Sequence, residues 1–202
     1  MTKIKLCGLM RVEDIFAVNE ILPEFIGFVF AKKSSRCIAP EKAVSLKKIL
    51  SKKISAVGVF VDEKIETVAD LANKNVVDLI QLHGAEDENY ISQLKKLTAK
   101  KIIKAFKIKT ADDLKVAENF PADFILLDSG AGTGKIFDWD ILKGFKRKYF
   151  LAGGLNCENV SSAVKILKPF AVDVSSGIET GGVKDAEKMK KFVEKVRSEK
   201  IL

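Results

Sequence analysis

The chain has 202 residues, of which 47% are hydrophobic and 31% charged, a composition that suits a globular protein with a sizeable core. No apolar run reaches the roughly 18 residues that a membrane-spanning helix needs, and the first residues lack the apolar core of a signal peptide, so we expect neither membrane insertion nor secretion. The net charge of +8 rests on scattered lysines, because only four of the 35 basic residues are arginine. We therefore expect no nucleic-acid partner.

The three cysteines, Cys7, Cys37 and Cys157, lie far apart and form no CxxC pair. An odd number without close spacing excludes a disulfide framework and a cysteine zinc site, and it favours a reducing, cytoplasmic environment. The single histidine, His83, cannot hold a metal ion alone. The sequence therefore predicts a cytoplasmic protein without a metal centre.

Eight apolar, β-branched runs recur along the chain, with starts between 21 and 30 residues apart. They are nearly continuous rather than alternating, which is typical of parallel strands buried on both faces. The runs are Ile4–Cys7, Phe25–Phe30, Ser55–Val61, Val76–Leu82, Lys101–Ile108, Asp123–Asp128, Tyr149–Ala152 and Phe170–Val174.

Helical periods separate these runs, with apolar residues three and four positions apart. Thr110, followed three residues later by Asp113, predicts a capping box at the start of the fifth helix. A sixth helix is expected near Asp138–Leu142. The clearest apolar stripes are Ile65, Val68, Ala69 and Ala72; Val160, Ala163, Val164 and Leu167; and Ala186, Met189, Val193 and Val196.

Eight strands alternating with eight helical segments, at about 25 residues a unit, predict an α/β fold: a small (β/α)8 TIM barrel that forms one domain over residues 1–202. A doubly wound open sheet usually has fewer strands and gives no reason for eight even units. We therefore expect the functional residues at the carboxyl ends of the strands, in the loops that lead to the helices.

The turns after the seventh and eighth predicted strands carry Gly153-Gly154 and Ser175-Ser176-Gly177. Glycine lets backbone N–H groups approach an anion closely, and these two loops are the usual phosphate site of the fold. A phosphate site is the favoured interpretation, and two ordinary strand-to-helix turns are the alternative.

Three further candidates also end predicted strands. Cys7 is either a small buried apolar residue or a thiolate that acts as base or nucleophile. Asp128 ends the apolar run FILLD, where partial burial would raise the pKa of its carboxyl group and suit a general acid. His83 is either a structural histidine or a substrate contact. The glycine loop at Gly130–Lys135 fits neither a P-loop nor a dinucleotide motif, and we expect it to cover a small ligand.

Taken in order, these segments resemble phosphoribosylanthranilate isomerase, an enzyme family of tryptophan biosynthesis. The resemblance covers nearly the whole chain. Its motifs are KLCG at Lys5–Gly8, SSR at Ser34–Arg36, GVFV at Gly58–Val61, QLHG at Gln81–Gly84, the segment Asp128–Trp139 that ends in FDW, LAGGL at Leu151–Leu155, and DVSSGIE with GVKD within Asp173–Asp185.

The resemblance implies a cofactor-free Amadori rearrangement of N-(5-phosphoribosyl)anthranilate, with Asp128 as general acid and Cys7 as general base. It further implies that Arg36 binds the anthranilate carboxylate and that His83 and Asp173 face the substrate. The phosphate would be held by Gly153, Gly154, Ser176 and Gly177. Ser35 stands where the family commonly has proline before the arginine.

Rival interpretations come from several protein classes. The related isomerase of histidine synthesis typically has aspartate at the position of Cys7 and a second phosphate loop in its first half. A ribulose-phosphate epimerase would need several metal-binding histidines. A non-catalytic barrel that binds a phosphorylated metabolite would not need both Cys7 and Asp128 at strand ends. We expect a small phosphorylated substrate as partner and no membrane partner, and the sequence leaves monomer and homodimer open.

Overall fold

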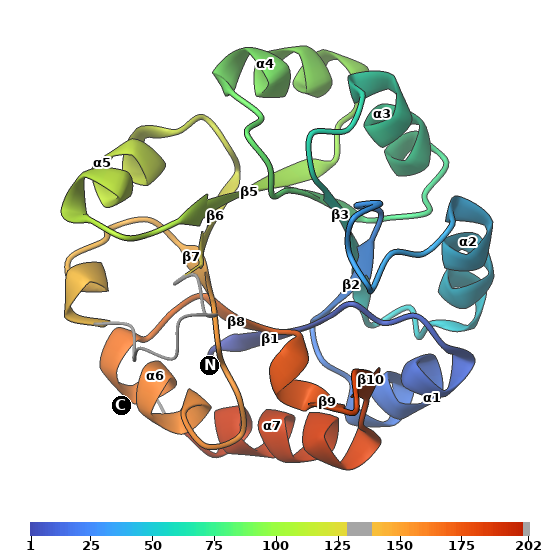
Figure 1. Ribbon diagram of the computed structural model, residues 1–202, viewed down its shortest axis with the longest axis vertical. Coiled ribbons are helices and arrows are strands. Elements are labelled where there is room, and N and C mark those ends of the chain that lie inside the picture. Colours follow the sequence, from blue (N-terminus) through green and yellow to red (C-terminus); the bar gives the residue numbers. More distant parts are fainter. Residues whose placement is uncertain (129–138, 200–202) are drawn as a thin grey trace.

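The computed structural model describes residues 1–128 and 139–199, and in them eight parallel strands close into a barrel (Figure 1). Each strand pairs with the next along the chain, and β1 closes the ring by pairing with β8. The predicted barrel is therefore confirmed. The strands are β1 (Lys3–Cys7), β2 (Phe25–Val29), β3 (Ser55–Phe60), β4 (Leu79–Leu82), β5 (Lys101–Lys107), β6 (Phe124–Asp128), β7 (Tyr149–Ala152) and β8 (Ala171–Val174).

Helices surround the barrel, and most residues of their predicted apolar stripes are buried against it. Ala186 of the last predicted stripe is exposed, and Phe192 is buried in that helix instead. The predicted capping box of Thr110 and Asp113 opens α5, with the side chain of each residue bonded to the backbone of the other. The α-helices are α1 (Val12–Ile21), α2 (Pro40–Ile49), α3 (Ile65–Asn73), α4 (Glu88–Leu97), α5 (Ala111–Asn119), α6 (Val160–Leu167) and α7 (Ala186–Ser198). None of the helices in the described ranges is both long and apolar enough to cross a bilayer.

Two 3-10 turns and a small hairpin complete the described fold. The sixth predicted helix is a 3-10 turn, η1 (Trp139–Leu142), and its expected first residue, Asp138, lies outside the described residues. The glycine loop at 130–135 also lies outside them. After β8 the chain forms a second 3-10 turn, η2 (Ser176–Ile178), and then a small antiparallel hairpin of β9 (Glu179–Thr180) and β10 (Val183–Lys184).

The fourth strand begins later than predicted. Val76 and Val77 are buried, yet they belong to the connection after α3, and the strand starts only at Leu79. Asn75 adopts a left-handed backbone with φ of 56°, and the N–H of Val76 bonds back to the carbonyl of Leu71 in the helix. The two valines pack the loop against the core, so their apolar character reports burial rather than strand pairing.

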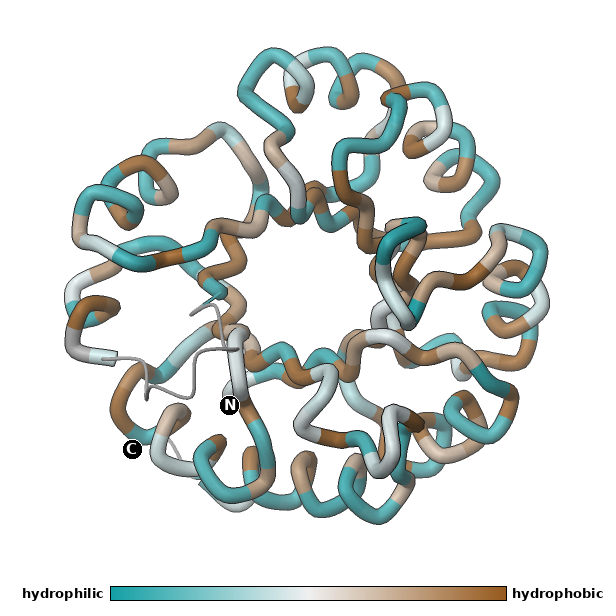
Figure 2. Tube along the Cα trace, viewed as in Figure 1, coloured by the Kyte–Doolittle hydropathy of each residue, from teal (hydrophilic) through white to brown (hydrophobic). Residues whose placement is uncertain are grey.

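The core has two layers, one between helices and strands and one inside the barrel. Figure 2 shows the helices with hydrophilic residues outward and hydrophobic residues toward the barrel. Inside, Phe150 packs against the rings of Phe25, Phe124 and Phe170, with ring centroids 5.4 to 5.9 Å apart. These rings stand at or near the amino ends of their strands, so they fill that end of the barrel. The interior can therefore open only at the carboxyl ends.

Candidate active site

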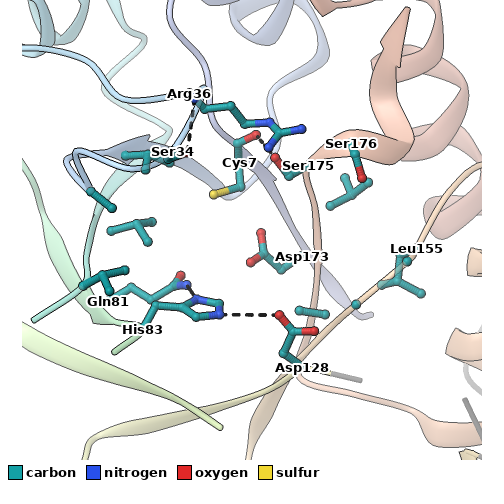
Figure 3. A pocket seen from close by; sticks show the side chains of 18 residues that line it. Cys7, Ser34, Arg36, Gln81, His83, Asp128, Leu155, Asp173, Ser175 and Ser176 are labelled. Carbon is teal, nitrogen blue, oxygen red and sulfur yellow. Dashed lines mark hydrogen bonds and ion pairs between the residues drawn. The ribbon is translucent and has the colours of Figure 1, made fainter. Parts of the chain in front are cut away.

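A cavity of about 390 Å³ lies at the carboxyl ends of the strands (Figure 3). Residues that the sequence placed on seven different loops or strand ends meet in its wall. Figure 3 shows Cys7 on one side of the cavity and Asp128 on the other, with Asp173 between them. The predicted site residues that line it are Cys7, Arg36, His83, Asp128, Gly153, Gly154, Asp173 and Ser176.

Cys7 ends β1 and is 8% exposed, with its thiol toward the cavity. Its neighbour across the parallel pair is Gly27 of β2. A Cβ atom at Gly27 would lie 2.5 Å from the Cys7 sulfur, so the glycine makes the space that the thiol occupies. Gly27 was not among the predicted site residues, although a glycine inside an otherwise apolar strand indicates a close approach.

A buried ion pair forms the floor of the cavity below Cys7. Lys5 of β1 is fully buried, and its Nζ lies 3.0 Å from both carboxylate oxygens of Asp173 on β8. Burial alone would lower the pKa of Lys5, but attraction to Asp173 and to Cys7 outweighs it and raises that pKa. Asp173 was predicted to face the substrate; it does line the cavity, and its partner Lys5 was not predicted.

The thiol of Cys7 titrates above its ordinary range. Burial is the largest influence and raises the pKa of Cys7, and attraction and hydrogen bonding from Lys5 oppose this rise. Asp173 adds to the rise, and Lys184 of β10 opposes it. The free thiol is therefore mostly protonated at neutral pH, and its thiolate, once formed, is a strong base.

His83 links β4 to Asp128 across the cavity. Its Nε2 lies 3.5 Å from Oδ2 of Asp128, and Nε2 of Gln81 lies 2.9 Å from its Nδ1. If the amide N–H of Gln81 donates to Nδ1, the proton of a neutral imidazole stands on Nε2, toward the carboxylate. Gln81 is 1% exposed and lines the cavity, and its Oε1 is buried with no hydrogen-bond partner among the described residues. A polar residue in the apolar strand LIQL was a sign of this role that sequence analysis did not use.

Arg36 is held by a carboxylate that sequence analysis did not predict. Its Nε and Nη2 lie 2.6 and 2.7 Å from the two oxygens of Glu179 on β9, a bidentate fork. Lys184 binds the same carboxylate at 2.6 Å and also donates to the carbonyl of Ser175 at 2.9 Å. Although burial alone would raise it, the hydrogen bonds from Arg36 and Lys184 hold the pKa of Glu179 below its ordinary value.

The glycines after β7 adopt the backbone that the phosphate prediction needs. Gly153 and Gly154 have φ of 92° and 66°, values that other residues rarely adopt, and both line the cavity beside Ser176 of η2. Gly177 is not among the lining residues. A Cβ atom there would lie 2.0 Å from the carbonyl oxygen of Leu155, so this glycine lets η2 pack on the loop after β7.

Within residues 1–128 and 139–199, no group of three or more His, Cys, Asp or Glu side chains is arranged to hold a metal ion. The ionisable side chains described in the cavity wall are instead guanidinium, carboxylate, thiol and imidazole groups, with an ammonium group below. Such a set can bind anions and exchange protons with a ligand.

Comparison with known proteins matches this arrangement to one family. The family model described as N-(5'phosphoribosyl)anthranilate (PRA) isomerase matches residues 4–195. The N-(5'-phosphoribosyl)anthranilate isomerase of Caldanaerobacter subterraneus subsp. tengcongensis is 47% identical over 204 residues, which cover 98% of each chain.

Solved structures agree. The crystal structure of phosphoribosyl anthranilate isomerase from Thermotoga maritima superposes with a TM-score of 0.91 at 36% identity, over 98% of this chain and 100% of that one. A phosphoribosyl anthranilate isomerase in complex with reduced 1-(o-carboxyphenylamino)-1-deoxyribulose 5-phosphate superposes with a TM-score of 0.88, also at 36% identity and over the same shares of the two chains. This chain is an isomerase of the N-(5'-phosphoribosyl)anthranilate isomerase family.

Proposed function

We propose that this protein converts N-(5-phosphoribosyl)anthranilate to 1-(2-carboxyphenylamino)-1-deoxyribulose 5-phosphate in tryptophan biosynthesis, with Asp128 as general acid and Cys7 as general base. The observation that carries the proposal is that these two side chains line opposite sides of one cavity. Relatives of the same family carry the name of this activity, and one of them has a reduced form of the product in its structure.

Ring opening comes first. The Asp128 carboxylic acid donates its proton to the ribose ring oxygen, the bond between that oxygen and C1 breaks, and the nitrogen lone pair forms a C1=N double bond. His83 would hold the carboxyl group in place from its 3.5 Å position. A positioned acid of this kind typically accelerates a reaction by about 10²–10⁴-fold.

Proton removal follows. The Cys7 thiolate takes the proton on C2, and the electron pair of that C–H bond forms a C1=C2 double bond while the nitrogen regains its lone pair. The resulting enolamine gains a proton at C1 and loses one from the C2 hydroxyl, which gives the ketone. Atoms balance, because the product is an isomer of the substrate, and no electron acceptor is required.

The two anionic ends of the substrate would be bound in two separate regions of the cavity. Gly153, Gly154 and Ser176 would bind the phosphate through backbone N–H groups and a hydroxyl, with Gly177 setting the packing of the two loops. Arg36 has five N–H groups, and its fork on Glu179 uses two of them. The other three can bind the anthranilate carboxylate, while Asp173 contacts the sugar.

The test is turnover, followed by the loss of fluorescence of the anthranilate adduct without added metal or cofactor. We expect Cys7→Ser and Asp128→Asn each to lower kcat by at least about 10²-fold with KM largely kept. Cys37→Ser is the matched control, because Cys37 is a partly buried cysteine outside the cavity lining. Turnover of Cys7→Ala and Asp128→Ala at near wild-type rates would refute the acid–base assignment.

A further inference from the structure

We propose that Lys5 is a positioning residue for the general base: its buried ammonium group is the fixed counter-ion of the Cys7 thiolate, and Asp173 sets how strongly it acts. The inference rests on the proposed function only in taking the Cys7 thiolate to be the general base. The pairing itself is a property of the free protein and can be measured without substrate.

The strand geometry brings the three groups together. Lys5 and Cys7 are two residues apart on β1, so their side chains point to the same side of the strand, into the barrel. Asp173 of β8 is the register partner of Lys5 and lines the same cavity as Cys7. Figure 3 shows the Asp173 carboxylate facing the cavity below the thiol.

The ammonium group of Lys5 cannot move away from this place. It is fully buried, and both oxygens of Asp173 hold it at 3.0 Å. A buried charge acts strongly on its neighbours because little water screens it. A buried pair usually adds little net stability, since an apolar pair of similar volume often serves as well. Stability alone therefore does not explain this pair. A lysine fixed next to a titratable thiol can stabilise the thiolate.

The other charges around Cys7 leave Lys5 as the strongest attraction. Among the groups that act on the thiol, Lys5 comes directly after burial, ahead of Asp173 and Lys184. Lys184 lies on β10 and is already bound to Glu179 and to the carbonyl of Ser175. Arg36, in the loop after β2, is bound by Glu179 as well and is a further cation that interacts with Cys7.

The other described surroundings of Cys7 are uncharged or lie across the cavity, and the hydroxyl of Ser175 donates to the Cys7 carbonyl at 3.1 Å. β2 and β3 contribute Val29 and Val59, which pack with Cys7 in one cluster. Asp128 and His83 face it from the far wall (Figure 3). Removal of the Lys5 charge should therefore make the thiolate harder to form, and removal of the Asp173 charge should make it easier, since Asp173 repels the thiolate.

The experiment is an ultraviolet titration of the Cys7 thiolate in a Cys37→Ser/Cys157→Ser background, with Cys7→Ser in that background as the blank. Burial raises the pKa of Tyr90 and Tyr149 to about 12, and the Cys7→Ser blank contains both tyrosines, so subtraction of the blank removes their ionisation from the thiolate signal. We expect Lys5→Met to move the midpoint up by about one pH unit or more, Asp173→Asn to move it down, and Lys5→Arg to stay near the parent.

Lys104→Met/Glu86→Gln is the matched control, because it removes another buried lysine–carboxylate pair that lies away from Cys7. Its midpoint should equal that of the parent. If Lys5→Met does not fold, Lys5→Met/Asp173→Asn compared with Asp173→Asn isolates the same charge, and the double variant should titrate at the higher pH. An unchanged midpoint on loss of Lys5, or an upward move in Asp173→Asn, would overturn the inference.

Failure of this inference is distinct from failure of the proposed function. If Cys7→Ser loses turnover but the thiolate midpoint is the same with and without Lys5, Cys7 is still the base and Lys5 is not its counter-ion. If Cys7→Ala keeps full turnover but the midpoint shifts as expected, Lys5 is the counter-ion of a thiolate that is not the base.

Discussion

Two of the lysine–carboxylate pairs that are buried in the described part of this chain have similar geometry, and they differ in what surrounds them. Lys5 and Asp173 lie inside the barrel, below a thiol that can titrate. Lys104 and Glu86 lie on the outside of the wall, where the lysine also donates to the carbonyl of Gly84 at 2.6 Å.

Both carboxylate oxygens of Glu86 accept hydrogen bonds within the fold. Its oxygens accept hydrogen bonds from the backbone N–H groups of Asp62 and Gly84, in addition to the bond from Lys104. This pair ties the loop after β3 to the loop after β4. Burial of an ion pair therefore does not by itself indicate function; the group next to the pair decides whether it has one.

The largest effect should come from breaking the outer pair. Lys104→Met leaves Glu86 as a buried charge without its cation, so we expect the free energy of unfolding to fall by about 3–5 kcal/mol. Urea denaturation measures it. Lys104→Met/Glu86→Gln should recover most of the loss, because no charge is then left unpaired. Equal stability of the single variant and the wild type would show that the outer pair has no structural role.

A third cation, Arg36, is also held by a carboxylate, at the rim of the cavity, and its proposed role is substrate binding. Arg36→Lys keeps the charge and loses the fork, so we expect a loss of about 1–3 kcal/mol, or roughly 5- to 150-fold in KM. Glu179→Gln should shift KM in the same direction by less, because an amide can still accept one bond. Steady-state kinetics with an unchanged kcat/KM for Arg36→Lys would remove it from the site.

The position of the thiol relative to Lys5 can be tested through Gly27. Gly27→Ala places a Cβ atom 2.5 Å from the Cys7 sulfur, so the thiol must move. We expect kcat to fall by about tenfold or more, because a displaced base no longer meets the reacting carbon in the productive geometry. Gly58→Ala is the control, since its Cβ meets Phe60 at 2.8 Å and should lower stability while leaving kcat near wild type. Equal kcat for Gly27→Ala and wild type would contradict this reading of the glycine.

The smallest effect should come from a chelator. Every cationic group described above is an ammonium or guanidinium group that a carboxylate holds in place, so we expect kcat/KM to be unchanged after treatment with a metal chelator. A loss of turnover that a divalent ion restores would show that metal takes part.

Features that a local sequence pattern marks were the ones that could be predicted. Cys7 and Asp128 were expected in one cavity because each ends an apolar run, and a parallel barrel brings such ends together. Lys5 could have been found as well, because a two-residue period puts it on the face of Cys7. Glu179 could not, since it contacts Arg36 across 143 residues of chain through a hairpin that no periodicity marks. The start of β4 was wrong because apolar residues at Val76 and Val77 reflect burial in a loop.

The packed phenylalanine rings around Phe150 separate the part of the barrel that stabilises the fold from the part that carries the cavity. They close the end of the barrel opposite the cavity, so much of the apolar contact that holds the strands in register lies away from the loops that carry the chemistry. Mutational libraries confined to the loops would then explore new substrates on a scaffold whose stability changes little. Substitutions chosen for heat resistance could be placed among the rings without altering selectivity.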